Sequence, residues 1–118
     1  APGGRHMRIE RRGGALVASI TNNDERSLYT PSVDLLFESA ANEAKERALG
    51  VILTGMGSDG LAGARALRAR GARVLTESES SCVVFGMPRA IQEAGLASGE
   101  ASLDTMATAI TRVVRRPA

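Results

Sequence analysis

Residues 50–63 read Gly-Val-Ile-Leu-Thr-Gly-Met-Gly-Ser-Asp-Gly-Leu-Ala-Gly, and the fold is built around this stretch. Residues 51–53 are a short apolar run, which is typical of a strand buried on both faces. Glycines then break the chain, and helical spacing resumes over residues 61–70. The strand, turn and helix place Asp59 at the carboxyl end of the strand, where open α/β sheets carry ligands and catalytic groups.

A hairpin and a loop are predicted before this stretch. Residues 7–12 and 15–20 are strand-like runs separated by Gly13-Gly14. Glycine tolerates the positive φ angles of a two-residue turn, so these runs predict a β-hairpin. The polar residues 21–30 predict an exposed loop.

Helices are predicted on both sides of the central strand. Pro31 is expected to start the first helix, with Ser32 as an alternative cap, and Gly50 to end it. After the helix at 61–70, residues 72–76 predict a second, parallel strand. The strand–helix–strand unit is expected to be a right-handed crossover.

The region after the second strand predicts another helix. Ser80 or Ser81 is expected to cap a helical turn that begins at Cys82. Pro88 removes a backbone donor, so the helix either kinks there or begins near Pro88. Gly95 is expected to close it.

The remaining segments complete the expected fold class. Residues 98–103 predict an edge strand or a loop, and residues 103–114 predict an amphipathic final helix. The apolar runs at 51–53 and 73–75 require neighbouring strands, and the chain opens without a methionine. We therefore expect part of a longer protein, with an α/β, doubly wound, Rossmann-like parallel sheet and a β-hairpin.

Composition limits the classes of function. The 118 residues suit one domain, and the net charge is only +2. Aromatic side chains are too few for base stacking, which disfavours nucleic-acid binding. There is no apolar run of membrane-spanning length and no signal peptide. The lone Cys82 fits a reducing compartment.

One interpretation of the glycine turn is dinucleotide binding. Gly55, Gly57 and Gly60 match G-x-G-x-x-G between a strand and a helix, and Glu77 and Glu79 follow where a ribose-binding carboxylate belongs. The negative charge of Asp59 would, however, lie inside the turn that cradles a pyrophosphate, which is unfavourable.

A second interpretation is that Asp59 is the acid of a hydrolase triad. A carboxylate at a strand end can accept the Nδ1–H of a histidine, fix its tautomer and stabilise the imidazolium. Backbone N–H groups of a glycine turn also suit a developing oxyanion. The simpler alternative, which the motif alone favours, is that Asp59 caps the helix beginning near Gly60.

The chain resembles the C-terminal part of the catalytic domain of the CheB family of chemotaxis protein-glutamate methylesterases. Four segments carry the resemblance in the family's order and spacing. They are Ala-Pro-Gly-Gly-Arg-His-Met at 1–7, Pro-Ser-Val-Asp-Leu-Leu-Phe at 31–37, the stretch at 50–60, and Ser-Cys-Val-Val-Phe-Gly-Met-Pro-Arg at 81–89.

The resemblance implies that residues 1–118 belong to a cytoplasmic hydrolase of chemotaxis, in two-component signal transduction. The family hydrolyses glutamate methyl esters on chemoreceptors, and some members deamidate receptor glutamines, through a Ser-His-Asp triad without metal or cofactor. Asp59 matches the triad acid, and Met56 matches the residue whose backbone N–H belongs to the oxyanion hole. The implied partners are a methylated chemoreceptor and a receiver domain in the full-length protein.

The family's nucleophilic serine and its histidine lie upstream of the matching segments, so the chain alone is expected to be inactive. His6 matches a different segment, and we interpret it as non-catalytic. Ser58 is interpreted as a turn residue, and Cys82 as a small buried side chain or a slightly activated thiol. Residues 28–30 stand where the family usually has basic residues. A docking domain that has lost catalysis is the remaining alternative.

Overall fold

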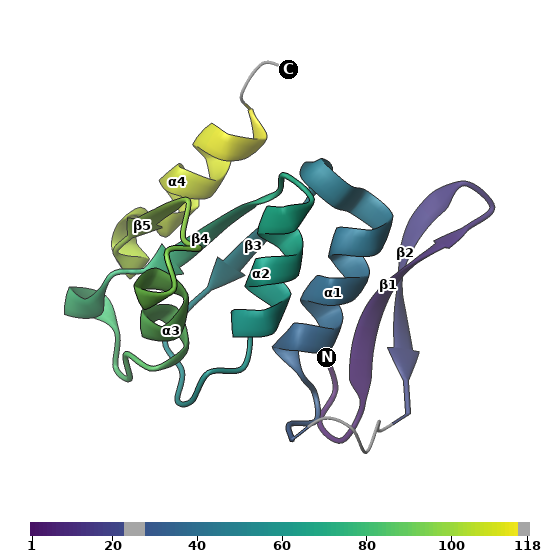
Figure 1. Ribbon diagram of the computed structural model, residues 1–118, viewed down its shortest axis with the longest axis horizontal. Coiled ribbons are helices and arrows are strands. Elements are labelled where there is room, and N and C mark those ends of the chain that lie inside the picture. Colours follow the sequence, from purple (N-terminus) through teal and green to yellow (C-terminus); the bar gives the residue numbers. More distant parts are fainter. Residues whose placement is uncertain (23–27, 116–118) are drawn as a thin grey trace.

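Two separate sheets organise the computed structural model, which describes residues 1–22 and 28–115 (Figure 1). The antiparallel hairpin is formed by β1 (His6–Arg12) and β2 (Ala15–Thr21). The parallel sheet has the order β3-β4-β5, with β3 (Leu49–Ile52), β4 (Arg73–Glu77) and β5 (Gly99–Ala101). The helices are α1 (Val33–Ala44), α2 (Leu61–Ala69), α3 (Met87–Glu93) and α4 (Leu103–Val114), with 3-10 turns at Lys45–Arg47 and Glu79–Ser81.

Most of the predicted elements are confirmed. The hairpin turns at Gly13-Gly14, and β3, α2 and β4 form a parallel strand–helix–strand unit. Pro88 lies in the first turn of α3, and residues 99–101 form an edge strand. The α/β class with a parallel sheet and a hairpin is thus correct. In the predicted loop at 21–30, residues 23–27 lie outside the described residues.

The predicted end of the first helix at Gly50 is wrong. Helix α1 stops at Ala44 because Lys45 adopts a positive φ of 53°. Gly50 instead lies inside β3, where a Cβ atom would come within 2.9 Å of Leu67 and 3.0 Å of Phe37. This glycine therefore allows two helices to pack closely on the strand rather than ending a helix.

The structure also differs from the prediction at other places. α1 begins at Val33, so the start at Pro31 is wrong; Ser32 occupies the alternative N-cap position, but its side chain makes no capping hydrogen bond. β3 ends at Ile52, which leaves Leu53 41 % exposed. No helical turn begins at Cys82, because the segment that follows it hydrogen-bonds to the loop after β3 instead.

An apolar cluster joins α1, α2 and α3 to the sheet. α1 packs on α2 and on β1, while α4 packs on β4 and β5. The buried members of the cluster are Phe37, Ala41, Ile52, Ala64, Leu67, Ala72, Val74 and Ile91. This packing brings the N-termini of α1 and α2 beside the carboxyl end of β3, along the lower edge of Figure 1.

Candidate functional site

Asp59 lies in the loop between β3 and α2, and its residue is only 8 % exposed. Its Oδ1 accepts hydrogen bonds from the Ser32 hydroxyl (3.1 Å) and the Asp34 N–H (3.0 Å), and its Oδ2 accepts one from the Val33 N–H (2.8 Å). All three donors belong to the N-terminus of α1. Free N–H groups and the helix dipole both favour a negative charge at this position.

Asp34 makes the reciprocal contact with α2. Its Oδ1 accepts hydrogen bonds from the N–H groups of Gly60 (2.9 Å) and Gly63 (2.8 Å). Asp59 thus lies before α2 but accepts N–H groups of α1, and Asp34 lies in the first turn of α1 but accepts N–H groups of α2. The prediction that Asp59 caps the helix near Gly60 is therefore wrong: Asp59 caps α1, and Asp34 caps α2.

The carboxylate of Asp59 has acceptor capacity left for one more donor. Two carboxylate oxygens together offer about four lone-pair positions. Oδ1 accepts two hydrogen bonds and Oδ2 accepts one from the described residues. A further N–H group that approaches the site would therefore find its acceptor at Oδ2 of Asp59.

The Met56 turn is held by the segment that leads into α3. The Gly55 N–H donates to Val84 O (3.0 Å), and Gly55 O accepts from the N–H groups of Gly86 (3.0 Å) and Met87 (2.8 Å). The Met56 residue is 82 % exposed. Its N–H makes no hydrogen bond to any described residue, so the turn offers a donor on a fixed backbone.

Glu77 is a buried carboxylate at the end of β4, with 1 % exposure. Its Oε1 accepts from the Thr54 N–H (2.8 Å) and its Oε2 from the Ser81 hydroxyl (2.7 Å). The Ser81 oxygen in turn accepts the Leu103 N–H (3.1 Å), so Ser81 caps α4 and not the helix predicted at Cys82. Glu77 is thus enclosed and engaged, which counts against a ribose-binding role, while Glu79 is exposed.

His6 is fully buried, and Ser32 lies between it and Asp59. The His6 Nδ1 accepts the Ser32 N–H (3.2 Å), which requires that the ring proton be on Nε2. The Nε2 atom is buried and has no hydrogen-bond partner. In this arrangement His6 has no free nitrogen to take a proton, and the exposed Ser58 has no histidine partner among the described residues.

Cys82 is a half-buried thiol whose Sγ donates to Glu77 O (3.8 Å). Burial is the main cause that raises the pKa of this thiol, and the negative charges of Glu77 and Glu79 raise it further. A raised pKa lowers the thiolate fraction at neutral pH, so the activated-thiol interpretation is disfavoured.

We expect Cys82 to react with iodoacetamide more slowly than free cysteine at pH 7. The rate should keep rising with pH beyond the range where a free thiol is already ionised, because the thiolate is the nucleophile. The same chain unfolded in guanidinium is the control, and there the rate should approach that of free cysteine. A rate in the folded chain equal to that of free cysteine at pH 7 would contradict the assignment.

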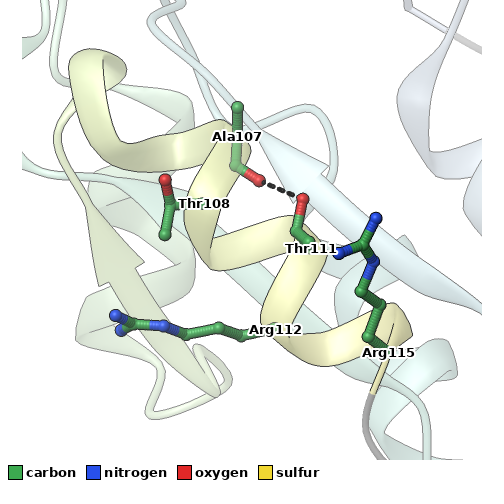
Figure 2. Close-up of a pocket in the computed structure, with 5 residues that line it drawn as sticks. All are labelled: Ala107, Thr108, Thr111, Arg112 and Arg115. Carbon is green, nitrogen blue, oxygen red and sulfur yellow. Dashed lines mark hydrogen bonds between the residues drawn. The ribbon is translucent and has the colours of Figure 1, made fainter.

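A separate hollow lies on the surface of α4 (Figure 2). Its lining residues are Ala107, Thr108, Thr111, Arg112 and Arg115. The Thr111 hydroxyl donates to Ala107 O (2.9 Å), and the two arginines extend in different directions from the helix. None of the predicted site residues lies there, so the carboxyl end of β3 remains the candidate site.

In residues 1–22 and 28–115, no group of three or more His, Cys, Asp or Glu side chains could hold a metal ion. Over the same residues, no helix is both long and apolar enough to span a membrane.

The sequence offers Asp59 and Met56 as candidates, but it indicates neither Ser32 as a donor to Asp59 nor the contacts of Asp34 with α2. From the sequence, Ser32 is expected only as a helix cap. The one signal for Asp34 is the acidic residue in the first turn of α1, which is common in helices. The spacing indicates only a ribose-binding role for Glu77, because nothing in the sequence links it to Thr54.

The comparisons with known proteins agree on one family. The family model described as CheB methylesterase matches residues 1–110. The protein-glutamate methylesterase/protein-glutamine glutaminase 5 of Myxococcus xanthus is 52 % identical over 115 residues, which are 98 % of this chain and 33 % of the relative. A protein of the same name, numbered 2, from Nitratidesulfovibrio vulgaris is 47 % identical over 93 % of this chain and 30 % of its own length.

A solved structure gives the same result. The crystal structure of the Thermotoga maritima CheB methylesterase catalytic domain matches 97 % of this chain with a TM-score of 0.91 and 32 % sequence identity. The match covers 60 % of that catalytic domain. The chain thus spans about a third of the length of these relatives and about three fifths of the solved domain.

Proposed function

Because this chain belongs to the CheB methylesterase family, we propose that it forms the C-terminal portion of a methylesterase catalytic domain in a longer protein. The proposed activity is hydrolysis of glutamate methyl esters on chemoreceptors, with deamidation of glutamines as a second reaction. The names of the relatives, which include both activities, support this assignment.

The buried carboxylate of Asp59 is the observation that carries the proposal. Three donors from α1 orient it, and one acceptor position remains at Oδ2. A triad acid has to be fixed in this way and still receive the Nδ1–H of a histidine. The free acceptor position at Oδ2, in the loop after β3, supports this second requirement.

The proposed reaction follows the serine-hydrolase scheme. A histidine from the rest of the protein donates its Nδ1–H to Asp59 Oδ2 and takes the proton of a serine hydroxyl through Nε2. The serine oxygen attacks the ester carbonyl, and the protonated histidine returns the proton to the leaving methanol. In the second half of the reaction, the histidine takes a proton from water and the water oxygen attacks the glutamyl-enzyme. The histidine then returns the proton to the serine oxygen as glutamate leaves. With glutamine as substrate, ammonia leaves instead of methanol.

Met56 is proposed to provide one oxyanion donor through its backbone N–H. That N–H has no partner among the described residues, and the hydrogen bonds of Gly55 fix the turn that carries it. A donor that is already oriented stabilises the developing negative charge without reorganisation during the reaction.

The partners and location follow the family and are part of the proposal. The protein substrate is a methylated chemoreceptor, a receiver domain is attached in the full-length protein, and the site of action is the cytoplasm. No nucleic acid, membrane insertion, metal or cofactor enters the proposed reaction. Dinucleotide binding is less well supported, because Asp59 and the enclosed Glu77 occupy the positions that such a ligand would need.

We expect the 118-residue chain alone to be inactive. The proposed nucleophile and base are outside it, and removal of either abolishes triad chemistry. Release of methanol from methylated receptor should be measured with this chain and with the longer protein that contains it. Activity of the longer protein alone supports the proposal. Hydrolysis by the isolated chain at a comparable rate would refute it, and activity in neither would favour the docking domain.

A further inference from the structure

The Ser32 hydroxyl is used in an unusual way for an N-cap residue. A serine at this position ordinarily accepts a hydrogen bond from an N–H of its own helix. Ser32 has the extended backbone of an N-cap, but its side chain makes no capping bond. Asp59 accepts the helix N–H groups in its place, and the Ser32 hydroxyl donates to Asp59 Oδ1. The hydroxyl is thus directed at the carboxylate.

His6 holds Ser32 from the other side. The imidazole is completely buried at the start of β1, and its Nδ1 accepts the Ser32 N–H (3.2 Å). The Nε2 atom finds no partner, which costs free energy in a buried site. The hydrogen bonds of the imidazole itself therefore do not explain why a histidine is buried at this position. What it provides is an acceptor for the backbone of Ser32.

We propose that Ser32 and His6 are positioning residues for the reaction, and this inference rests on the proposed role of Asp59. His6 fixes the backbone of Ser32, and the Ser32 hydroxyl fixes Oδ1 of Asp59. With Oδ1 occupied, the carboxylate presents Oδ2 to the catalytic histidine. Neither residue contacts the reacting atoms in this scheme.

The first test compares three variants in the longer protein. Ser32→Ala removes the hydroxyl, and Ser32→Thr keeps it. Ser39→Ala is the control, because Ser39 is a half-buried serine within α1 whose hydroxyl bonds to Leu36 O (2.7 Å) and the Ile9 N–H (2.8 Å) instead of to Asp59. Melting temperatures of all variants establish that the proteins compared are folded.

We expect Ser32→Ala to lower kcat about tenfold, as for the loss of a hydrogen bond to a charged group, with KM within about twofold. Ser32→Thr and Ser39→Ala should keep kcat near the parent value. The acid limb of the kcat/KM profile should also move to higher pH in Ser32→Ala. Loss of a donor leaves more negative charge on Asp59, which favours the protonated form of the histidine.

A double-mutant cycle separates positioning from general stability. In an Asp59→Asn background, Ser32→Ala should cause no further loss of kcat, because its effect passes through the carboxylate. An equal loss in both backgrounds, or kcat of Ser32→Ala within twofold of the parent, would overturn the inference for Ser32 while leaving the role of Asp59 intact. If Asp59→Asn itself retains full activity, the proposed function fails first.

His6 is tested by two substitutions of different acceptor capacity. His6→Asn places an amide oxygen where Nδ1 stands and should retain most of kcat, whereas His6→Leu should lower kcat about as much as Ser32→Ala. A loss of several orders of magnitude in His6→Asn would instead make His6 the catalytic base. Equal kcat in both variants would show that the hydrogen bond to Ser32 does not position the site.

Discussion

Replacement of Asp59 by asparagine is expected to lower kcat of ester hydrolysis by about 10⁴-fold in the longer protein, the size of effect known for triad acids. Asparagine has nearly the same shape but carries no charge to stabilise an imidazolium. It can also present an NH₂ group where the histidine needs an acceptor, which favours the wrong tautomer. KM should change much less, since Asp59 is not proposed to contact the substrate.

Asp34→Asn is the matched control for this variant. Both carboxylates accept backbone N–H groups at a helix N-terminus, Asp59 at α1 and Asp34 at α2. Each substitution should therefore lower the free energy of unfolding, by about 1–2 kcal/mol, through the lost charge at the helix terminus. Only Asp59→Asn should also remove activity by orders of magnitude. Similar losses of kcat in the two variants would reduce Asp59 to a helix cap.

The sequence predicts the elements around the site better than the contacts within it. The strand before the glycine turn, the helix after it and the hairpin at Gly13-Gly14 depend on local spacing and turn chemistry, and these are readable in the sequence. The end of α1 was missed because it depends on the positive φ of Lys45, a residue that rarely adopts it. The sequence instead indicates Gly50 as the end, because glycine commonly follows the last residue of a helix.

The contacts of Asp59 could not be predicted for a different reason. Its donors are 25 to 27 residues away in the chain, and only the packing of α1 against α2 brings them together. A capping aspartate is expected to serve the helix that follows it, which is the local solution. The reciprocal arrangement with Asp34 satisfies the same N–H groups, but it depends on tertiary structure. The same holds for Glu77, whose partner Thr54 lies in another strand's loop.

Gly86 is the position where the smallest change should most disturb the oxyanion turn. Its φ of −109° suits any residue, so alanine there causes no backbone strain. A Cβ atom would, however, lie 2.7 Å from Gly55 O and 2.9 Å from Gly57 N. These are backbone atoms on both sides of Met56, so the turn itself has to move.

Gly86→Ala is therefore expected to lower kcat by about 10²–10³-fold, the cost of a lost oxyanion donor, with a smaller change in KM. Overpacking should also lower the free energy of unfolding by about 1–3 kcal/mol. Gly99→Ala in β5 is the control, because its Cβ would stand 3.5 Å from Leu75, an ordinary contact. If Gly86→Ala loses stability but keeps kcat, the Met56 N–H is not the oxyanion donor, because a displaced turn cannot leave that geometry intact.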